Sequence, residues 1–287
     1  MVRISERKRQ KMGKFSGWLL AADFDDTLRP ERPGVEAVPE ENRRAVEYFI
    51  AQGGFFTIAT GRDLRSYLHI RPLFAHNAPV ILGNGAVLYD PEEGRVLEER
   101  LLPPECGQDL REFMDAFPLA GVEIHRGAEV SACRENECLR EHLRSMGAAI
   151  CPAEAAGVPQ PWNKVVLLFD GASSGCCPEA HDGAAWIKEH FPGRYEAVPS
   201  GPLVDVVAAG CDKGAGLRRL AERLGVKRSR VVSVGDSWND LPMLRTAGRA
   251  FAPAGAAEDV LREAFVTAVG PCPVCIRDVV ERLENDL

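Results

Sequence analysis

The N-terminal third of the chain alternates short, continuously apolar runs with segments of helical periodicity, and this order restricts the possible folds more than any other feature. The apolar runs are WLLAADF at 18–24, FFTIATG at 55–61 and APVILGNGA at 78–86. Because both faces of each run are apolar, each predicts a strand buried in a parallel sheet. The segments between them, 38–54 and 63–74, predict helices. The order indicates an α/β fold with a doubly wound (Rossmann-like) parallel sheet.

The pattern changes after the third run and returns near the C-terminus. Residues 86–102 predict a hairpin, and residues 103–199 mix predicted helices and strands without the parallel order. A predicted strand at 203–210 and another at 229–236, separated by a helix, then resume the α/β order. We therefore predict a basic N-terminal tail at 1–15, a core domain at 16–102 and 200–287, and an inserted α+β cap domain at 103–199.

The composition excludes several classes of partner. With 35 Lys and Arg against 42 Asp and Glu, the net charge of −7 gives no overall attraction to nucleic acid or to an anionic membrane. No apolar run approaches the about 18 residues of a membrane-spanning helix. Nine cysteines at irregular spacings are typical of reduced thiols in a cytoplasmic protein. The basic stretch at 1–14 predicts a frayed tail or short leader rather than a nucleic-acid arm.

Three carboxylates crowd at the end of the first predicted strand: Asp23, Asp25 and Asp26. Since like charges this close repel, the cluster indicates either a bound cation or an acid and a base side by side. Side chains alternate along a strand, so Asp23 and Asp25 are predicted to share a face while Asp26 points away. Asp236 ends a later strand, and such strand ends meet at one edge of a sheet. Asp23, Asp25 and Asp236 form an all-oxygen set that favours Mg²⁺ over zinc.

Groups suited to a phosphate occur at the same predicted edge. Thr60 and Gly61 follow the second strand and offer a hydroxyl and an accessible backbone N–H, while Lys213 begins a helix. Taken singly, Thr60 is typical of a helix cap, Lys213 of an exposed lysine, and Asp240 of a helix N-cap together with Asn239. The whole set, in order and at strand ends, indicates a phosphoryl-binding site with a carboxylate nucleophile that forms an aspartyl-phosphate.

Four motifs resemble those of the haloacid dehalogenase-like (HAD) hydrolases. They are DFDDTL at 23–28, TIATGR at 57–62, CDKGAGLRRL at 211–220 and VGDSWNDLPML at 234–244. ILGNGAVLYD at 81–90 resembles the segment before the cap in the Cof-type branch. The predicted cap, between the second and third motifs, is similar to that of class IIB members.

The resemblance implies a role for each motif residue. Asp23 would be the nucleophile, and Asp25 would be the general acid and then the general base, with a protonated fraction that neighbouring negative charge helps to supply. Mg²⁺ would be held by Asp23, by the backbone carbonyl of Asp25 and by Asp236. The remaining implied contacts are Thr60, Gly61, Lys213 and Asn239 on the phosphate, with Asp240 and Arg62 in support.

Two features depart from the family pattern. Asp26 occupies a position where many members have glycine, which adds negative charge near the metal. CPVCIRDVV at 272–280 stands where relatives often carry Gly-Val. Its Cys272 and Cys275 are open to three interpretations: buried thiols, a redox pair or half of a metal site. A second metal set, on the predicted cap, would comprise His125, Cys133, Cys138 and His142.

The sequence therefore predicts a Mg²⁺-dependent phosphatase that hydrolyses a small phosphorylated metabolite, such as a sugar phosphate, through an aspartyl-phosphate. The alternative is a phosphomutase or phosphotransferase, which would use the same intermediate with a different acceptor. A phospho-receiver module and a catalytically silent scaffold agree less well, because a cap interrupts the domain and every expected catalytic residue is present. We expect a monomer or weak homodimer with no nucleic-acid or membrane partner.

Overall fold

The computed structural model describes residues 13–32, 34–127, 129–145, 150–170 and 177–287. Most of the predicted basic tail therefore lies outside the described residues. Phe15, at the end of that predicted tail, is fully buried, and its ring lies 4.7 Å from the ring of Phe49. The predicted boundary is thus wrong at this residue, because burial of a large aromatic ring outweighs the freedom of a chain end.

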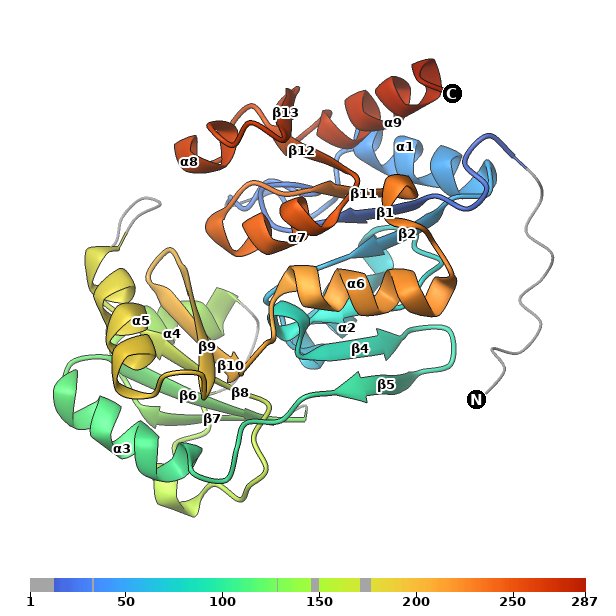
Figure 1. The fold of residues 1–287 in the computed structure, drawn as a ribbon. Helices are drawn as coiled ribbons and strands as arrows, with labels where there is room; N and C mark the ends of the chain where they lie inside the picture. The colour runs from blue at the N-terminus through green and yellow to red at the C-terminus, as the bar shows by residue number, and fades with distance from the viewer. Residues whose placement is uncertain (1–12, 33, 128, 146–149, 171–176) are drawn as a thin grey trace.

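Five parallel strands form sheet 1, in the spatial order β13-β12-β11-β1-β2 (Figure 1). Their bounds are Leu19–Ala22 (β1), Phe55–Ile58 (β2), Val231–Val234 (β11), Arg249–Pro253 (β12) and Val266–Val269 (β13). β1 lies between β11 and β2, and all of its residues are buried. The predicted doubly wound parallel sheet is confirmed.

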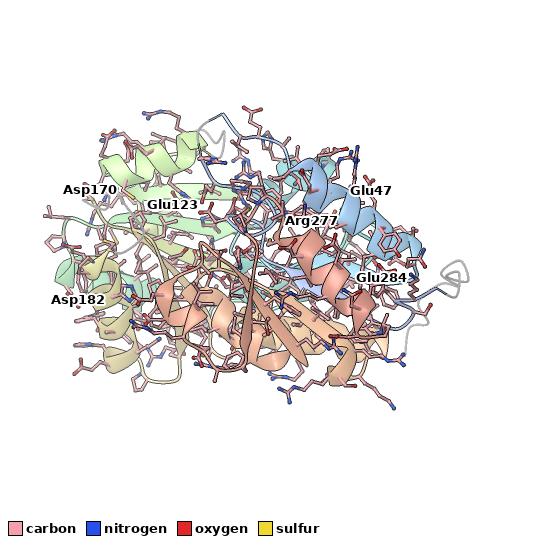
Figure 2. The ribbon with its side chains drawn as sticks, turned by 90° about the horizontal axis from the view of Figure 1, so that it is seen from above. Glu47, Glu123, Asp170, Asp182, Arg277 and Glu284 are labelled. Carbon is pink, nitrogen blue, oxygen red and sulfur yellow. The ribbon has the colours of Figure 1, made fainter. Side chains whose placement is uncertain are left out.

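Helices cover both faces of sheet 1. The helices of this part of the chain are α1 (Glu40–Ala51), α2 (Leu64–Ile70), α6 (Lys213–Leu224), α7 (Leu241–Thr246), α8 (Glu258–Leu261) and α9 (Cys275–Asn285). α1 and α9 lie side by side in both views (Figures 1 and 2). Leu20 and Ala22 of β1 pack toward this pair, whereas Leu19 and Ala21 pack toward α6 and α7, because side chains alternate along a strand. None of the helices described is long and apolar enough to cross a membrane.

The third predicted strand forms, but its main partner is a hairpin. β3 (Val80–Leu82) touches the end of β2 through a parallel bridge between Ala59 and Ile81. It pairs antiparallel with β4 (Val87–Asp90), which in turn pairs with β5 (Arg95–Glu99), and these three strands form sheet 3. The predicted hairpin is thus confirmed, and it widens the edge of the parallel sheet.

Five antiparallel strands form sheet 2, in the order β7-β6-β8-β10-β9. This part of the chain contains β6 (Gly121–Arg126), β7 (Glu129–Arg134), β8 (Lys164–Leu168), β9 (Tyr195–Ser200) and β10 (Leu203–Ala208), with α3 (Cys106–Ala116), α4 (Glu137–Ser145) and α5 (Pro178–His190). α3 and α5 pack on one face, and α4 packs on the other through Leu139 and Leu143.

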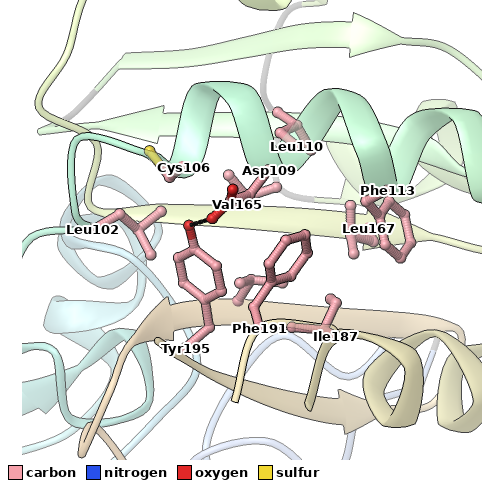
Figure 3. Close-up of a pocket in the computed structure, with 11 residues that line it drawn as sticks. Leu102, Cys106, Asp109, Leu110, Phe113, Val165, Leu167, Ile187, Phe191 and Tyr195 are labelled. Atoms are coloured by element: carbon pink, nitrogen blue, oxygen red, sulfur yellow. Dashed lines mark hydrogen bonds between the residues drawn. The ribbon is translucent and has the colours of Figure 1, made fainter. Parts of the chain in front are cut away.

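A small cavity lies between α3, α5 and sheet 2 (Figure 3). Its volume is about 30 Å³, and its walls are mostly apolar. The carboxylate of Asp109 accepts a hydrogen bond from the Tyr195 hydroxyl at 2.5 Å. Because ligand sites usually measure about 300–1,000 Å³, this cavity is a packing space rather than a binding site.

The sequence assigns the strand near Leu203 to the parallel core, and this assignment is wrong. β10 pairs antiparallel with β8 and β9, so it belongs to sheet 2. A short apolar strand has the same pattern in either sheet, because burial and not strand direction determines its composition. The predicted cap boundary after Pro199 therefore falls inside β9, and the inserted sheet continues to Ala208.

Candidate active site

The carboxyl ends of sheet 1 open onto a cavity of about 630 Å³ that residues of sheet 2 line from the other side. The sequence-predicted residues that line it are Asp23, Asp25, Thr60, Gly61, Arg62, Lys213, Asp236 and Asn239. Asp240 is fully buried next to it. The fold thus brings together segments from both ends of the chain.

Lys213 is held between two carboxylates. Its ammonium lies 2.7 Å from Oδ1 of Asp23 and 2.7 Å from Oδ1 of Asp240, and its side chain is 1% exposed. Helix α6 begins at this lysine, and Asp212 caps it by accepting a hydrogen bond from the Ala215 N–H. Burial alone would lower the pKa of Lys213, but the two carboxylates outweigh burial and raise it. The ammonium therefore stays charged at neutral pH.

The loop after β11 is organised around the buried carboxylate of Asp240. Its Oδ2 accepts hydrogen bonds from the backbone N–H groups of Asp236, at 2.9 Å, and Ser237, at 3.0 Å. A Cβ at Gly235 would lie 2.5 Å from the Asp240 Cβ, so the tight loop requires glycine there. Both Asp240 oxygens are thus engaged, one by Lys213 and the other by the backbone.

Asp23, Asp236 and Asp240 form an acidic cluster in which each residue offers an oxygen within 4.8 Å of the others. Oδ1 of Asp236 also accepts a hydrogen bond from the Thr27 hydroxyl at 2.6 Å. Burial, with the nearby charge of Asp240, raises the pKa of Asp236 to about 7. Burial likewise raises the pKa of Asp23, against the opposing effect of Lys213. This concentrated negative charge, presented by oxygen ligands, fits a hard divalent cation.

Asp25 is bound by two arginines. Nε and Nη2 of Arg62 donate to its two oxygens, each at 2.8 Å, and Nη2 of Arg29 donates at 2.9 Å. Both guanidinium groups also lie over the ring of Phe24. Burial would raise the pKa of Asp25, but the arginines outweigh it and the pKa lies below its ordinary value. The expectation that neighbouring negative charge supplies a protonated fraction is therefore wrong.

Asp26 also lines the cavity, and the strand alternation on which its predicted orientation rests does not apply here. β1 ends at Ala22, and Asp26 has a φ of 56°, so strand alternation does not extend to it. Its carboxylate accepts a hydrogen bond from the backbone N–H of Glu31 at 2.8 Å. Aspartate tolerates this left-handed conformation better than most residues, which explains how a residue other than glycine occupies it.

Thr60, Gly61 and Asn239 lie beside the acids. Oγ1 of Thr60 accepts a hydrogen bond from the Arg62 N–H at 3.1 Å. A Cβ at Gly61 would lie 3.0 Å from Oδ2 of Asp205, so the close approach of sheet 2 leaves little room for a side chain. Oδ1 of Asn239 is buried and has no hydrogen-bond partner among the described residues. A hydroxyl, a backbone and an amide group thus line the cavity together with the acids.

Sheet 2 contributes charged residues that the sequence analysis did not assign to this site. Lys164, Asp205 and His125 line the cavity from sheet 2, opposite Asp63. Lys164 and Asp205 form an ion pair at 2.9 Å, and His125 pairs with Asp63 at 2.9 Å. The sequence does contain a sign that Lys164 and Asp205 have a special role: each is a charged residue inside an apolar strand pattern, KVVLLF and LVDVV. A charge on a buried strand needs a partner.

The comparison with known families agrees with this geometry. The sequence profile of the haloacid dehalogenase-like hydrolases matches residues 20–268. The chain belongs to this family. The resemblance drawn from the four motifs is confirmed.

Curated relatives of this HAD-like hydrolase are named as phosphatases. The HMP-PP phosphatase of Serratia proteamaculans is 28% identical over 236 residues, which cover 80% of this chain and 81% of that enzyme. The phosphoglycolate phosphatase of Methanopyrus kandleri is 43% identical over 76 residues, which are 26% of this chain and 33% of that enzyme. The prediction of a hydrolase acting on phosphate esters is confirmed.

Solved structures of HAD members share the fold. A subclass IIB sugar phosphatase superposes on the HAD-like hydrolase with a TM-score of 0.75 and covers 94% of this chain and 98% of its own. The sequence identity is 22%, so this likeness establishes the fold alone. The predicted fold, an α/β core with an inserted α+β domain, is confirmed.

Cys272 and Cys275 of this HAD-like hydrolase contact the loop that carries the three clustered aspartates. Both thiols donate to the carbonyl oxygen of Thr27 at 3.1 Å. Burial raises the pKa of Cys272 to about 12, so the thiol stays protonated and unreactive. Cys275 is buried as one of the three interpretations predicts, whereas Cys272 is only half-buried. Within the described part of the chain, no metal-binding group forms from His125, Cys133, Cys138 and His142.

Proposed function

We propose that this hydrolase is a Mg²⁺-dependent phosphatase that hydrolyses a small phosphorylated metabolite, a sugar phosphate or a similar phosphomonoester. The observation that carries the proposal is the 2.7 Å contact between the Lys213 ammonium and Asp23, beside the carboxylate of Asp236. A buried cation for the phosphate, a carboxylate that can attack phosphorus and a second carboxylate for a metal thereby face one cavity.

Asp23, Asp236 and the backbone carbonyl of Asp25 would hold the Mg²⁺ ion. The raised pKa values of Asp23 and Asp236 support this assignment, because a cation stabilises carboxylates that burial and mutual repulsion destabilise. Asp240 would position Lys213 instead, since both of its oxygens are already engaged. When bound, the ion supplies charge neutralisation to the phosphoryl oxygens.

Two carboxylates would carry the covalent steps. Asp23 would attack phosphorus and form an aspartyl-phosphate, while Asp25 would give a proton to the departing oxygen. Asp25 would then take a proton from a water molecule whose oxygen attacks the aspartyl-phosphate, which releases inorganic phosphate and restores Asp23. The groups proposed to hold the phosphoryl oxygens are Thr60, Gly61, Lys213 and Asn239.

The arginines on Asp25 set a condition for this cycle. Arg62 and Arg29 favour the ionised carboxylate, whereas the first step needs the acid. We therefore expect a substrate phosphate to draw the Arg62 guanidinium toward itself, which weakens its bonds to Asp25. Arg62 would thus support both phosphate binding and proton transfer.

Sheet 2 with α3, α4 and α5, within residues 103–208, would act as the cap that selects the substrate. The cavity wall on this side offers hydrogen-bonding groups from Ser200, Asp205 and Lys164. In the described part of that wall, Lys164 and His125 already face carboxylates, so a neutral, hydroxylated leaving group fits better than a second anion.

The eight cysteines among the described residues are all free thiols. This supports a reducing, cytoplasmic environment, in which we expect a monomer or weak homodimer that acts on small metabolites.

The test is phosphate release from a panel of phosphorylated metabolites in Mg²⁺, with Asp23→Asn as the matched inactive variant. We expect release by the wild-type protein and none by the variant. Failure of the wild-type protein on the whole panel would overturn the proposal. Transfer of labelled phosphate to a sugar acceptor instead of water would identify a phosphotransferase.

A further inference from the structure

The segment Gly61–Asp63 is held at both ends by sheet 2. Nζ of Lys164 donates to the carbonyl oxygen of Gly61 at 3.1 Å, and Nδ1 of His125 lies 2.9 Å from Oδ2 of Asp63. The residue between these contacts, Arg62, binds both oxygens of Asp25. Arg62, which binds the proposed acid Asp25, is therefore the immediate chain neighbour of both residues that contact sheet 2.

His125 and Lys164 act on this segment from one face of sheet 2. They lie directly opposite each other on β6 and β8, so their side chains leave the same face. Each is braced by an acid of its own sheet: Glu123 Oε2 lies 3.2 Å from Nε2 of His125, and Asp205 Oδ1 lies 2.9 Å from Nζ of Lys164. Glu123 lies within the molecule, inward of the peripheral Asp182 (Figure 2).

These contacts fix geometry more than they add stability. His125 is 2% exposed and Lys164 is 8% exposed, so forming the pairs removes four charged or polar groups from water. The cost of desolvating such groups offsets most of their attraction, and the same groups regain water when the two sheets separate. The interface can therefore be broken and remade at small net cost, while the position of Gly61–Asp63 is well defined whenever the sheets meet.

We propose that His125 and Lys164 are positioning residues that fix Gly61–Asp63 and, through it, keep Arg62 within reach of both Asp25 and the substrate phosphate when sheet 2 lies against sheet 1. The role given to Asp25 rests on the proposed function. Because both residues also line the cavity, direct contact with the leaving group is the competing explanation. The two explanations differ in whether the loss of kcat in a variant depends on the leaving group of the substrate.

Kinetics with two unlike leaving groups separate these explanations. For His125→Gln and Lys164→Gln we expect kcat to fall between about 10-fold and about 100-fold, as for a small misplacement of reacting groups, with KM nearly unchanged. The factor is the same for glycerol 1-phosphate and for ribose 5-phosphate, whose leaving alcohols need similar help from an acid but differ in shape, whereas Lys164→Arg restores part of kcat. Losses that differ between the two substrates would overturn the proposal in favour of direct contact.

Hydrogen–deuterium exchange tests the same proposal without activity. The N–H of Arg62 donates to Thr60 Oγ1 and the N–H of Ser66 donates to Asp63, so both report on the segment. We expect residues 61–66 to exchange faster in both glutamine variants, with α1 unchanged. Unchanged protection of 61–66 would overturn the positioning role, whatever the outcome for the proposed function.

Matched controls come from exposed cap residues and from the other side of the interface. Lys188→Gln and His190→Gln on α5 change neither kcat nor exchange. If a variant folds poorly, Asp63→Asn removes the same ion pair from the sheet 1 side, and asparagine still caps α2. Asp63→Asn is then expected to match His125→Gln in both measurements, and wild-type behaviour of Asp63→Asn would contradict the proposal.

Discussion

The ammonium of Lys213 lies 2.7 Å from a carboxylate oxygen of Asp23, although the two residues are 190 positions apart in the chain. The contact is buried, and Asp240 accepts a second hydrogen bond from the same ammonium at 2.7 Å. A lysine held this way cannot swing into solvent, so its charge is directed at whatever binds beside Asp23. The predictions below start from this contact.

Replacing Lys213 by methionine should remove activity and lower stability. The variant leaves Asp23 and Asp240 buried without their cation, and breaking a buried pair in this way costs about 3–5 kcal/mol. The free energy of unfolding, measured with urea, and phosphate release test the two effects. A variant with wild-type stability would show that the ion triad is not formed.

The three clustered acids should differ in their effects. Asp23→Asn should abolish turnover because the nucleophile is lost, and Asp25→Asn should lower kcat by about 100-fold or more because the proton transfer is lost. Asp26→Asn should keep activity within about threefold, since asparagine tolerates the φ of 56° and still accepts the Glu31 N–H. Steady-state kinetics of the three variants measure these losses. An inactive Asp26→Asn variant would contradict the prediction that Asp26 is not needed for catalysis.

Chelation should stop turnover, and Mg²⁺ should restore it. A cation also relieves the repulsion among Asp23, Asp236 and Asp240, so Mg²⁺ at a hundred times its Kd should stabilise the fold by about 2.7 kcal/mol. Thermal unfolding with and without Mg²⁺ measures this shift, and Asp236→Asn should reduce it strongly. Full turnover in excess EDTA would rule out the metal assignment.

The contribution of His125 to stability should fall as pH rises. Burial lowers its pKa, but hydrogen bonds to Asp63 and Glu123 outweigh burial and raise the pKa above the ordinary value of 6.5. The stabilisation is therefore complete below about pH 6.5 and is lost as pH rises through the raised pKa of the folded state. Hydrogen bonds to the charged ring suggest that His125→Gln costs about 1.5–3 kcal/mol at pH 5.5.

The measurement is urea unfolding of wild type and His125→Gln at pH 5.5 and pH 9. The other charged groups near the ring, Lys164 and His142, are present in both proteins, so the difference isolates His125. A larger destabilisation at pH 9 than at pH 5.5 would show that the ring is neutral when paired. His190→Gln, on the exposed side of α5, serves as the control.

Sheet 1 could be predicted from the sequence because its strands are apolar on both faces and alternate with helices. The site residues could be predicted to converge for a related reason. Asp23, Thr60 and Asp236 each follow a parallel strand, and the carboxyl ends of parallel strands meet at one edge. Lys213 is predicted from its position in the third motif. It lines the same cavity, in agreement with the prediction that it lies at this edge of the sheet.

The rest depends on contacts that local patterns do not encode. The strand β10 has the composition of a buried strand but pairs in sheet 2, and only its partners reveal this. Asp26 enters the cavity because the chain leaves the strand conformation before reaching it. Arg62, which helps to lower the pKa of Asp25, and the charged residues of sheet 2 act through tertiary contacts that no spacing rule predicts.

Residues 209–212 join the last strand of sheet 2, which ends at Ala208, to α6, which starts at Lys213. If sheet 2 and its helices, the proposed cap, swing as a lid, this short linker is a hinge that adjoins Lys213, the lysine beside the proposed nucleophile. A swing about such a hinge carries the far end of the lid through a wide arc but displaces residues beside the pivot very little. Such a motion would open the cavity for exchange of substrate and product while the ammonium of Lys213 stays next to Asp23.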